Sequence, residues 1–130
     1  MKKKRAFLLF LLCISLLCTA CGAQELADGT YWMDVTLTGG SGRATVQSPA
    51  EVSVTGEKAE ATVIWSSPYY VYMLVDGVRY EPVQTEENAV FRIPVVLDQD
   101  MSVTACTVAM SEPHEIDYTL HFDSTSRKGA

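Results

Sequence analysis

The chain has 130 residues and a formal net charge of −6, with sixteen acidic and ten basic residues. Four of the basic residues lie among the first five positions, so a chain that lost its first twenty residues would carry a net charge of −10. Such an acidic surface argues against nucleic-acid binding and against direct attachment to anionic lipid, because both need a basic surface. About 110 residues would then remain, enough for one domain with a single core.

The beginning of the chain has the layout of a secretory signal peptide. A basic start is followed by an apolar run over residues 6–17, which is too short and wrongly flanked for a stable membrane span. Two small residues then precede Cys21, which resembles the lipobox of bacterial lipoproteins, although Cys18 stands where leucine is usual. We expect a signal peptide over residues 1–20 and a lipidated tether over residues 21–28, and the alternative is a plain secreted protein.

The rest of the chain alternates between apolar and polar side chains with a period of two, which is the pattern of β-strands. Pro94 points away from the apolar face of its run and indicates an edge or bulged strand, because proline cannot donate to a ladder. We expect an all-β domain over residues 29–123, an antiparallel immunoglobulin-like β-sandwich of seven to nine strands, followed by a polar tail over residues 124–130. The side chains expected to face inward include Tyr31, Met33, Val35, Leu37, Val52, Val54, Ala61, Val63, Trp65, Phe91, Ile93, Val95 and Leu97.

Residues 69–80 form the clearest predicted hairpin. Its turn is Asp76-Gly77, because both positions of such a turn need positive φ, and it pairs Met73 with Tyr80. One face would point to the core, which makes Met73 a core residue, and the other is a half-exposed aromatic surface of the kind that binding sites use. The first face carries Val71, Met73, Val75, Val78 and Tyr80, and the second carries Tyr70, Tyr72, Leu74, Arg79 and Glu81.

Three segments of the chain resemble the haem-binding surface modules of Gram-positive bacteria. They read "DGTYWMDVTLTGGSGRATVQSPAEVSV", "WSSPYYVYMLVDG" and "AMSEPHEIDYTLHF", and together they span most of residues 28–122. The resemblance is to the Shp-type haem-binding domain and, more distantly, to NEAT domains, which are also immunoglobulin-like. It implies a lipid-anchored, extracytoplasmic carrier of haem or another iron compound. Such a carrier would take haem from a donor protein and pass it to an uptake transporter, with the lipid as its only contact with the membrane.

The resemblance also suggests ligands for the haem iron. Shp-type domains hold the iron between two methionine sulfurs, whereas NEAT domains mostly use a tyrosine of the final hairpin. Met110 best matches the second methionine, Met73 is the candidate for the first, and His114 is an alternative axial ligand. The NEAT pair of tyrosines four residues apart is not present in the last strand, which has Tyr118 and Phe122 instead. The side chains expected to line the haem pocket are Trp65, Tyr69, Tyr70, Tyr72 and Tyr80.

The residues themselves leave ordinary alternatives open. Met110 stands at a predicted strand end, where a ligand is accessible, but a methionine there also caps a core. His114 opens the last strand on its apolar face, where a histidine is often a satisfied core or rim residue, and His121 falls on the solvent-exposed face. Haem needs an apolar slot with one or two axial ligands, and thioether ligation favours the ferrous state.

Functions of other classes are also compatible with the sequence. A Cu(I) carrier is one, since soft donors select Cu(I). A cofactor-free adhesion or partner-binding module that uses the Tyr70 and Tyr72 face is another. An enzyme is not expected, because the two histidines face opposite ways and no catalytic or phosphate-binding motif is present. The donors available for Cu(I) are Met73, Met101, Met110, Cys106 and His114.

Overall fold

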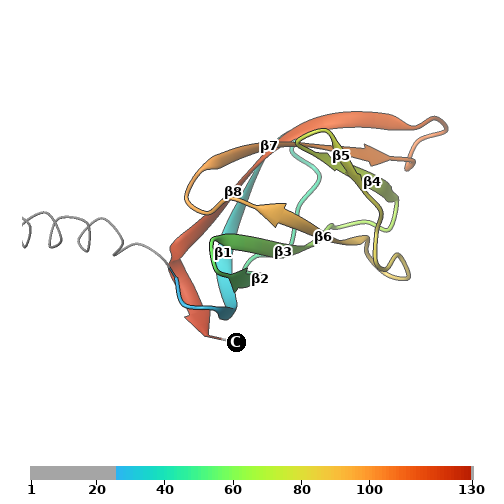
Figure 1. The fold of residues 1–130 in the computed structure, drawn as a ribbon. Helices are drawn as coiled ribbons and strands as arrows, with labels where there is room; N and C mark the ends of the chain where they lie inside the picture. Colours follow the sequence, from blue (N-terminus) through green and yellow to red (C-terminus); the bar gives the residue numbers. More distant parts are fainter. Residues whose placement is uncertain (1–25, 130) are drawn as a thin grey trace, which may run out of the picture.

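A computed structural model of the protein describes residues 26–129 and contains eight β-strands in that range (Figure 1). Cys21 and the leader lie outside the described residues, so the signal peptide and the lipidation site stay predictions. Within residues 26–129, no helix is long and apolar enough to cross a membrane. The strands are β1 (Gly29–Gly39), β2 (Ala50–Thr55), β3 (Lys58–Ile64), β4 (Tyr70–Val75), β5 (Val78–Tyr80), β6 (Val90–Val95), β7 (Asp100–Thr107) and β8 (His114–Gly129).

The eight strands form one antiparallel sheet in the order β5-β4-β7-β8-β1-β2-β3-β6. The sheet folds over on itself, so that its two edge strands, β5 and β6, approach each other across the core (Figure 1). Long strands at the middle of the sheet allow this fold, since β1 pairs with β2 along its first half and with β8 from Tyr31 to Gly39, with a register shift between Trp32 and Asp34. The predicted fold class, an antiparallel immunoglobulin-like β-sandwich, is confirmed.

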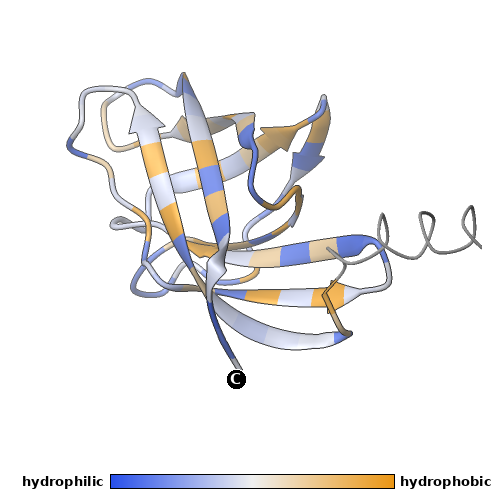
Figure 2. Ribbon diagram, turned by 90° about the vertical axis from the view of Figure 1, so that its left-hand side faces the viewer, coloured by the Kyte–Doolittle hydropathy of each residue, from blue (hydrophilic) through white to orange (hydrophobic). Residues whose placement is uncertain are grey.

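The core lies between the two layers and is built from the inward-facing half of each alternating run. Buried and exposed side chains alternate along β2 and β6. Figure 2 shows hydrophobic and hydrophilic residues following each other along the strands. Pro94 lies on the exposed side of β6, which pairs only with β3, so the predicted edge strand is confirmed. The largest fully buried side chains are Trp65, Phe91, Phe122, Met33, Met73, Ile93 and Leu120.

The hairpin of β4 and β5 has the predicted turn and register. Asp76 and Gly77 have φ values of 51° and 76°, and Met73 lies opposite Tyr80. The prediction of Val78 as a core side chain is wrong, since 52% of its surface is exposed. The reason is its position at the turn end of a three-residue edge strand, where no further strand covers it.

A β-bulge reverses the alternation at the beginning of β4. The register between β4 and β7 shifts between Tyr70 and Tyr72, because the extra residue, Val71, bends the strand. Tyr70 therefore faces the core and is 6% exposed, whereas Tyr72 stays on the outer face. The prediction that Tyr70 and Tyr72 share one outer surface is wrong, and so is the prediction of Val71 as a core residue, since Val71 is only half-buried.

The last strand is longer than the sequence pattern indicated. β8 continues to Gly129, and its end pairs with the beginning of β1, where Trp32 lies opposite Lys128. The predicted polar tail over residues 124–130 is therefore strand as far as Gly129. Polar side chains are compatible with this part of β8 because most of them are exposed to solvent.

Candidate functional site

Three aromatic side chains close one end of the core. Trp65 follows β3, Tyr70 begins β4 and Tyr118 faces inward from β8, and all three are buried. The rings of Trp65 and Tyr70 are stacked, with centroids 4.2 Å apart and planes at 24°. The ring of Tyr118 lies 5.2 Å from that of Trp65 at 56°. Aromatic pairs at these separations add stabilisation beyond the hydrophobic effect of the area they bury. We call these three side chains the aromatic cluster, and it stabilises this end of the core.

The connection between β1 and β2, residues 40–49, lies directly against the aromatic cluster. A Cβ on Gly40 would come within 2.9 Å of the Tyr118 ring, so the absence of a side chain at Gly40 permits this close approach. Further along, Val46 forms an isolated bridge with Trp65. The connection therefore covers the aromatic cluster and separates it from the solvent.

Polar atoms of the aromatic cluster are buried together with its rings. Nε1 of Trp65 has no hydrogen-bond partner among residues 26–129, and an unpaired buried donor costs about 1–3 kcal/mol. Burial raises the pKa of the Tyr70 hydroxyl, and a hydrogen bond with Tyr118 raises it further. Trp65 and Tyr70 were predicted to line a haem pocket, but a ligand would reach them only after displacing the covering connection.

Beyond the aromatic cluster, the hairpin of β7 and β8 extends past the core (Figure 1). It presents apolar side chains to solvent. Its turn, residues 108–113, includes Met110, which is 69% exposed, and Val108, which is 37% exposed. Tyr69 is 52% exposed and lies beside Val108, whose amide donates to the Tyr69 carbonyl over 2.9 Å. His114 begins β8 and is exposed. We call the surface formed by Tyr69, Val108, Met110 and His114 the hairpin ledge.

At the hairpin ledge, His114 continues the inner surface of the sheet. His114 lies opposite Thr107 in the β7–β8 ladder and shares its face of β8 with Ile116 and Tyr118. Exposure rises along this face, from Tyr118 in the core, through the half-buried Ile116, to the exposed His114. The imidazole of His114 is therefore on the inner face of the hairpin, on the same face of β8 as Tyr118 of the aromatic cluster but outside the core.

The two methionines predicted as haem ligands are not brought together. Met73 has no exposed surface and lies between Tyr80 and Ala105 in the sheet, whereas Met110 is on the hairpin ledge. No ligand could contact both sulfurs unless the core opened. The geometry favours a packing role for Met73, which the sequence had left open. The soft donors considered for Cu(I) are also divided between the interior and the surface. Cys106 and Met73 are buried, whereas Met110 and His114 are exposed.

On the outer side of the sheet, Tyr72 is the centre of a polar network. Its hydroxyl donates to Oε2 of Glu115 over 2.6 Å. The guanidinium carbon of Arg79 lies 4.0 Å from the centre of its ring, and Nε of Arg79 donates to Glu81 over 2.8 Å. Cys106 lies between Tyr72 and Glu115 on the middle strand and is buried. Tyr72 thus has partners within the protein already, in contrast to the side chains of the hairpin ledge.

Tyr70 and Tyr72 are expected to stay protonated at pH values at which ordinary phenols ionise. A hydrogen bond to Glu115 is the main cause that raises the pKa of Tyr72, and burial is the main cause for Tyr70. Because the folded state holds both protons more tightly than the unfolded chain, this stabilisation is complete below about pH 10 and is lost as the pH rises through the folded pKa values. Phenolate absorbance, titrated for the wild type beside Tyr70→Phe and Tyr72→Phe, checks this. Ionisation of all six tyrosines in one step in the folded protein would contradict it.

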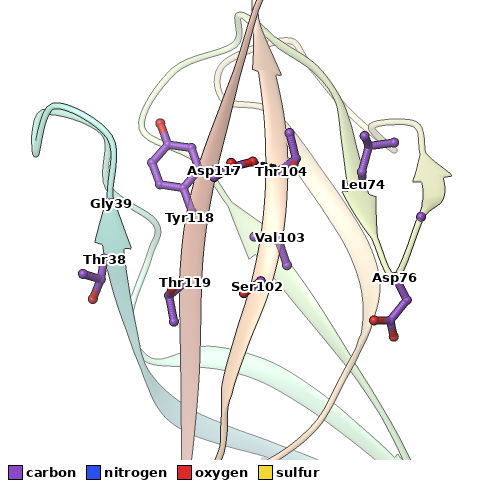
Figure 3. Close-up of a pocket in the computed structure, with 11 residues that line it drawn as sticks. Thr38, Gly39, Leu74, Asp76, Ser102, Val103, Thr104, Asp117, Tyr118 and Thr119 are labelled. Carbon is purple, nitrogen blue, oxygen red and sulfur yellow. Dashed lines mark hydrogen bonds between the residues drawn. The ribbon is translucent and has the colours of Figure 1, made fainter.

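A groove of about 570 Å³ crosses the outer face of β1, β8, β7 and β4 (Figure 3). Its walls combine hydroxyls and carboxylates, and Oγ1 of Thr104 donates to Oδ1 of Asp117 over 2.9 Å. No histidine, cysteine or methionine lines it, so it offers haem iron no axial ligand. Its polar side chains are Thr38, Asp76, Ser102, Thr104, Asp117 and Thr119.

The hairpin ledge is the described surface whose donors suit haem. An imidazole and a thioether are both axial ligands of haem iron, and His114 and Met110 are accessible to a large planar ligand. Tyr69 and Val108 add apolar and aromatic surface beside them. No three His, Cys, Asp or Glu side chains in residues 26–129 are grouped as a metal site.

The sequence pattern did not identify the aromatic cluster, the Tyr72–Glu115 bond or the groove. Tyr118 and Glu115 belong to an ordinary alternating run, and the groove hydroxyls look like any solvated face of a strand. The Tyr72–Glu115 bond and the groove arise because β1, β8, β7 and β4 are neighbours in the sheet, and the aromatic cluster also needs the end of β3 to fold against them. The available signal for the aromatic cluster was the inward position of Trp65, which the alternation did predict.

No protein-family model and no curated protein matches the sequence. Solved structures do share its fold. The NEAT5 domain of IsdX2, a B. anthracis hemophore in complex with heme, is similar with a TM-score of 0.62 and 16% sequence identity, over 76% of this chain and 98% of that domain. A mutant of that NEAT5 domain, also in complex with heme, is similar with a TM-score of 0.62 and 18% identity, over 77% and 98%. At these identities the similarity establishes a common fold.

Proposed function

We propose that this domain binds haem on the hairpin ledge. The observation that carries the proposal is the exposure of Tyr69, Val108, Met110 and His114 at one end of the β7–β8 hairpin, where the inner face that carries His114 leaves the core. Large apolar side chains gathered on an exposed surface are typical of binding sites. The shared fold with a NEAT domain solved in complex with haem supports the same ligand.

His114 and Met110 are the proposed axial ligands. Haem supplies an iron centre with two axial positions, and a neutral imidazole nitrogen or a thioether sulfur donates a lone pair to such a centre. Tyr69 would stack against the porphyrin, and Val108 would exclude water from its face. Met73 is assigned to packing, and Trp65, Tyr70, Tyr72 and Tyr80 to the support of the hairpin rather than to contact with the ligand.

The proposal extends to a relay of haem at the bacterial surface. If Cys21 is lipidated, the domain is tethered outside the cell membrane by its lipid, and residues 22–28 are a short link to β1. A ligand held on an open ledge is accessible to a second protein, which suits a carrier that receives haem from a donor and passes it to an uptake transporter.

Titration of the mature chain with haemin tests the proposal. We expect a shifted Soret band that saturates at one haem per chain, with a position typical of histidine or methionine ligation. A parallel titration with Cu(I) distinguishes a copper carrier, and a protein that binds partners without a cofactor would respond to neither. A Soret band that stays at the position of free haemin at every protein concentration would rule out haem binding.

A further inference from the structure

The groove on the outer face of the sheet has no part in the proposed haem site. It crosses four neighbouring strands on the face opposite to the one that carries His114, so a ligand in the groove would leave the hairpin ledge free (Figure 3). Thr38 lies opposite Thr119, and Thr119 lies opposite Ser102, so three hydroxyl side chains form a row across β1, β8 and β7. Neighbouring strands are about 4.8 Å apart, which gives the row a regular spacing.

The groove is negatively charged and has no cation of its own. Asp117 is in its wall and Asp76 is at the turn of the β4–β5 hairpin, and no lysine, arginine or histidine lines it. The nearby basic side chains of the same face already have acidic neighbours. Arg79 is paired with Glu81 at 2.8 Å, and Nδ1 of His121 lies 2.9 Å from Asp100. The field of the two groove carboxylates is thus not neutralised by the described protein.

Shape and charge together indicate the kind of occupant. The groove is open along its length and its side chains are short, whereas small-molecule sites are usually enclosed and mostly apolar. A row of hydroxyls with two carboxylates near it suits an extended chain whose basic side chains reach the carboxylates and whose other polar groups bond the hydroxyls. An acidic mature domain also attracts a basic partner over distance.

We propose that this groove docks an extended, lysine- or arginine-bearing segment of a partner protein. Asp76 and Asp117 provide the charge contacts, and Thr38, Ser102 and Thr119 provide hydrogen bonds. Docking here leaves the hairpin ledge uncovered, so a partner could be held while the ledge exchanges its ligand. The inference concerns a surface separate from the ledge and does not depend on haem binding.

The test uses a fluorescein-labelled decapeptide of alternating lysine and serine, with a glutamate–serine decapeptide as the probe of opposite charge. Fluorescence anisotropy with the mature chain gives the affinity, and amide chemical shifts map the site. The Asp76→Asn/Asp117→Asn variant removes two charges, and asparagine tolerates the positive φ of Asp76 and retains an acceptor for Thr104. The matched control, Glu86→Gln/Glu87→Gln, removes two charges from the exposed β5–β6 connection.

We expect the groove variant to bind the lysine peptide about tenfold more weakly and the control less than about twofold more weakly, at about 0.1 M salt. We also expect amide shifts at Thr38, Ser102 and Thr119. Equal weakening in both variants would overturn the proposal, because it would mean attraction to net charge alone. Shifts confined to another face would overturn it as well. The haemin titration of the same samples is read separately, so failure of one proposal leaves the other intact.

Discussion

Replacement of Met73 by alanine is expected to lower the free energy of unfolding by about 2–5 kcal/mol, which is the usual cost of removing a large buried side chain. Met73 has no exposed surface and is one of the largest side chains of the core, so its loss leaves a cavity between the layers. Its neighbours in the sheet, Ala105 and Tyr80, are held by strand pairing and cannot move in to fill the space. Denaturant unfolding, followed by tryptophan fluorescence, measures the change.

The matched variant Met73→Leu separates packing from ligation. Leucine keeps most of the side-chain volume but has no sulfur, so the expected cost is below about 1.5 kcal/mol. A packing role predicts that the haem spectrum of the folded Met73→Leu protein equals that of the wild type. A changed axial-ligand spectrum in this variant would mean that the core opens to admit haem, and the assignment of ligands to the hairpin ledge would then be wrong.

Replacement of His114 and Met110 by alanine is expected to lower haem affinity by about tenfold or more, which corresponds to about 1.4 kcal/mol of binding free energy. The stability of the protein should change by less than about 0.5 kcal/mol, because both side chains are exposed. Haemin titration and denaturant unfolding on the same samples give both quantities. The single variants identify which donor is bound, since loss of an axial ligand changes the spectrum as well as the affinity.

His121→Ala is the control for this experiment. His121 is on the same strand as His114 but on the outer face, where its ring is paired with Asp100. The His121→Ala variant removes the same kind of side chain as His114→Ala, but from a position that does not belong to the hairpin ledge. An equal loss of haem affinity in His121→Ala and His114→Ala would contradict the proposed site and would indicate adventitious binding to surface histidines.

The strand pattern and the β4–β5 turn were predictable because they are local. Alternation with a period of two decides which side chains face the core, and the Asp76-Gly77 pair favours the positive φ values that the turn needs. Pro94 marked an edge strand for an equally local reason, the missing amide proton. In each case the signal lies within a few residues, so the surrounding fold was not needed to interpret it.

The position of Tyr70 was not predictable from the same pattern. A single extra residue at Val71 reverses the alternation, and nothing in the local sequence distinguishes a bulged strand from a regular one. The bulge turns Tyr70 towards the core, where it stacks on the nearby Trp65 and also meets Tyr118 of β8, a residue from a distant part of the chain. A face assignment that extends alternation through a bulge is therefore wrong on one side of it.

The candidate site was predictable in its residues but not in its geometry. Met110 and His114 were candidates from the resemblance and from their place at the end of a strand, and both are accessible. The pairing of Met110 with Met73 was the part that needed the fold, because two residues far apart in sequence meet only if the sheet order brings them together. The described fold encloses one and exposes the other.

For this protein, the sequence alone determined the all-β class, the inward and outward residues of most strands and one hairpin with its register, because hydrophobic periodicity and turn chemistry act over short distances. The tertiary structure alone decided that the last polar residues join β8, that Tyr70 turns inward, and that hydroxyls from three strands form a groove. Each of these depends on which strands become neighbours. That choice is made by the burial of the whole core, a sum over contacts that no short stretch of the chain contains.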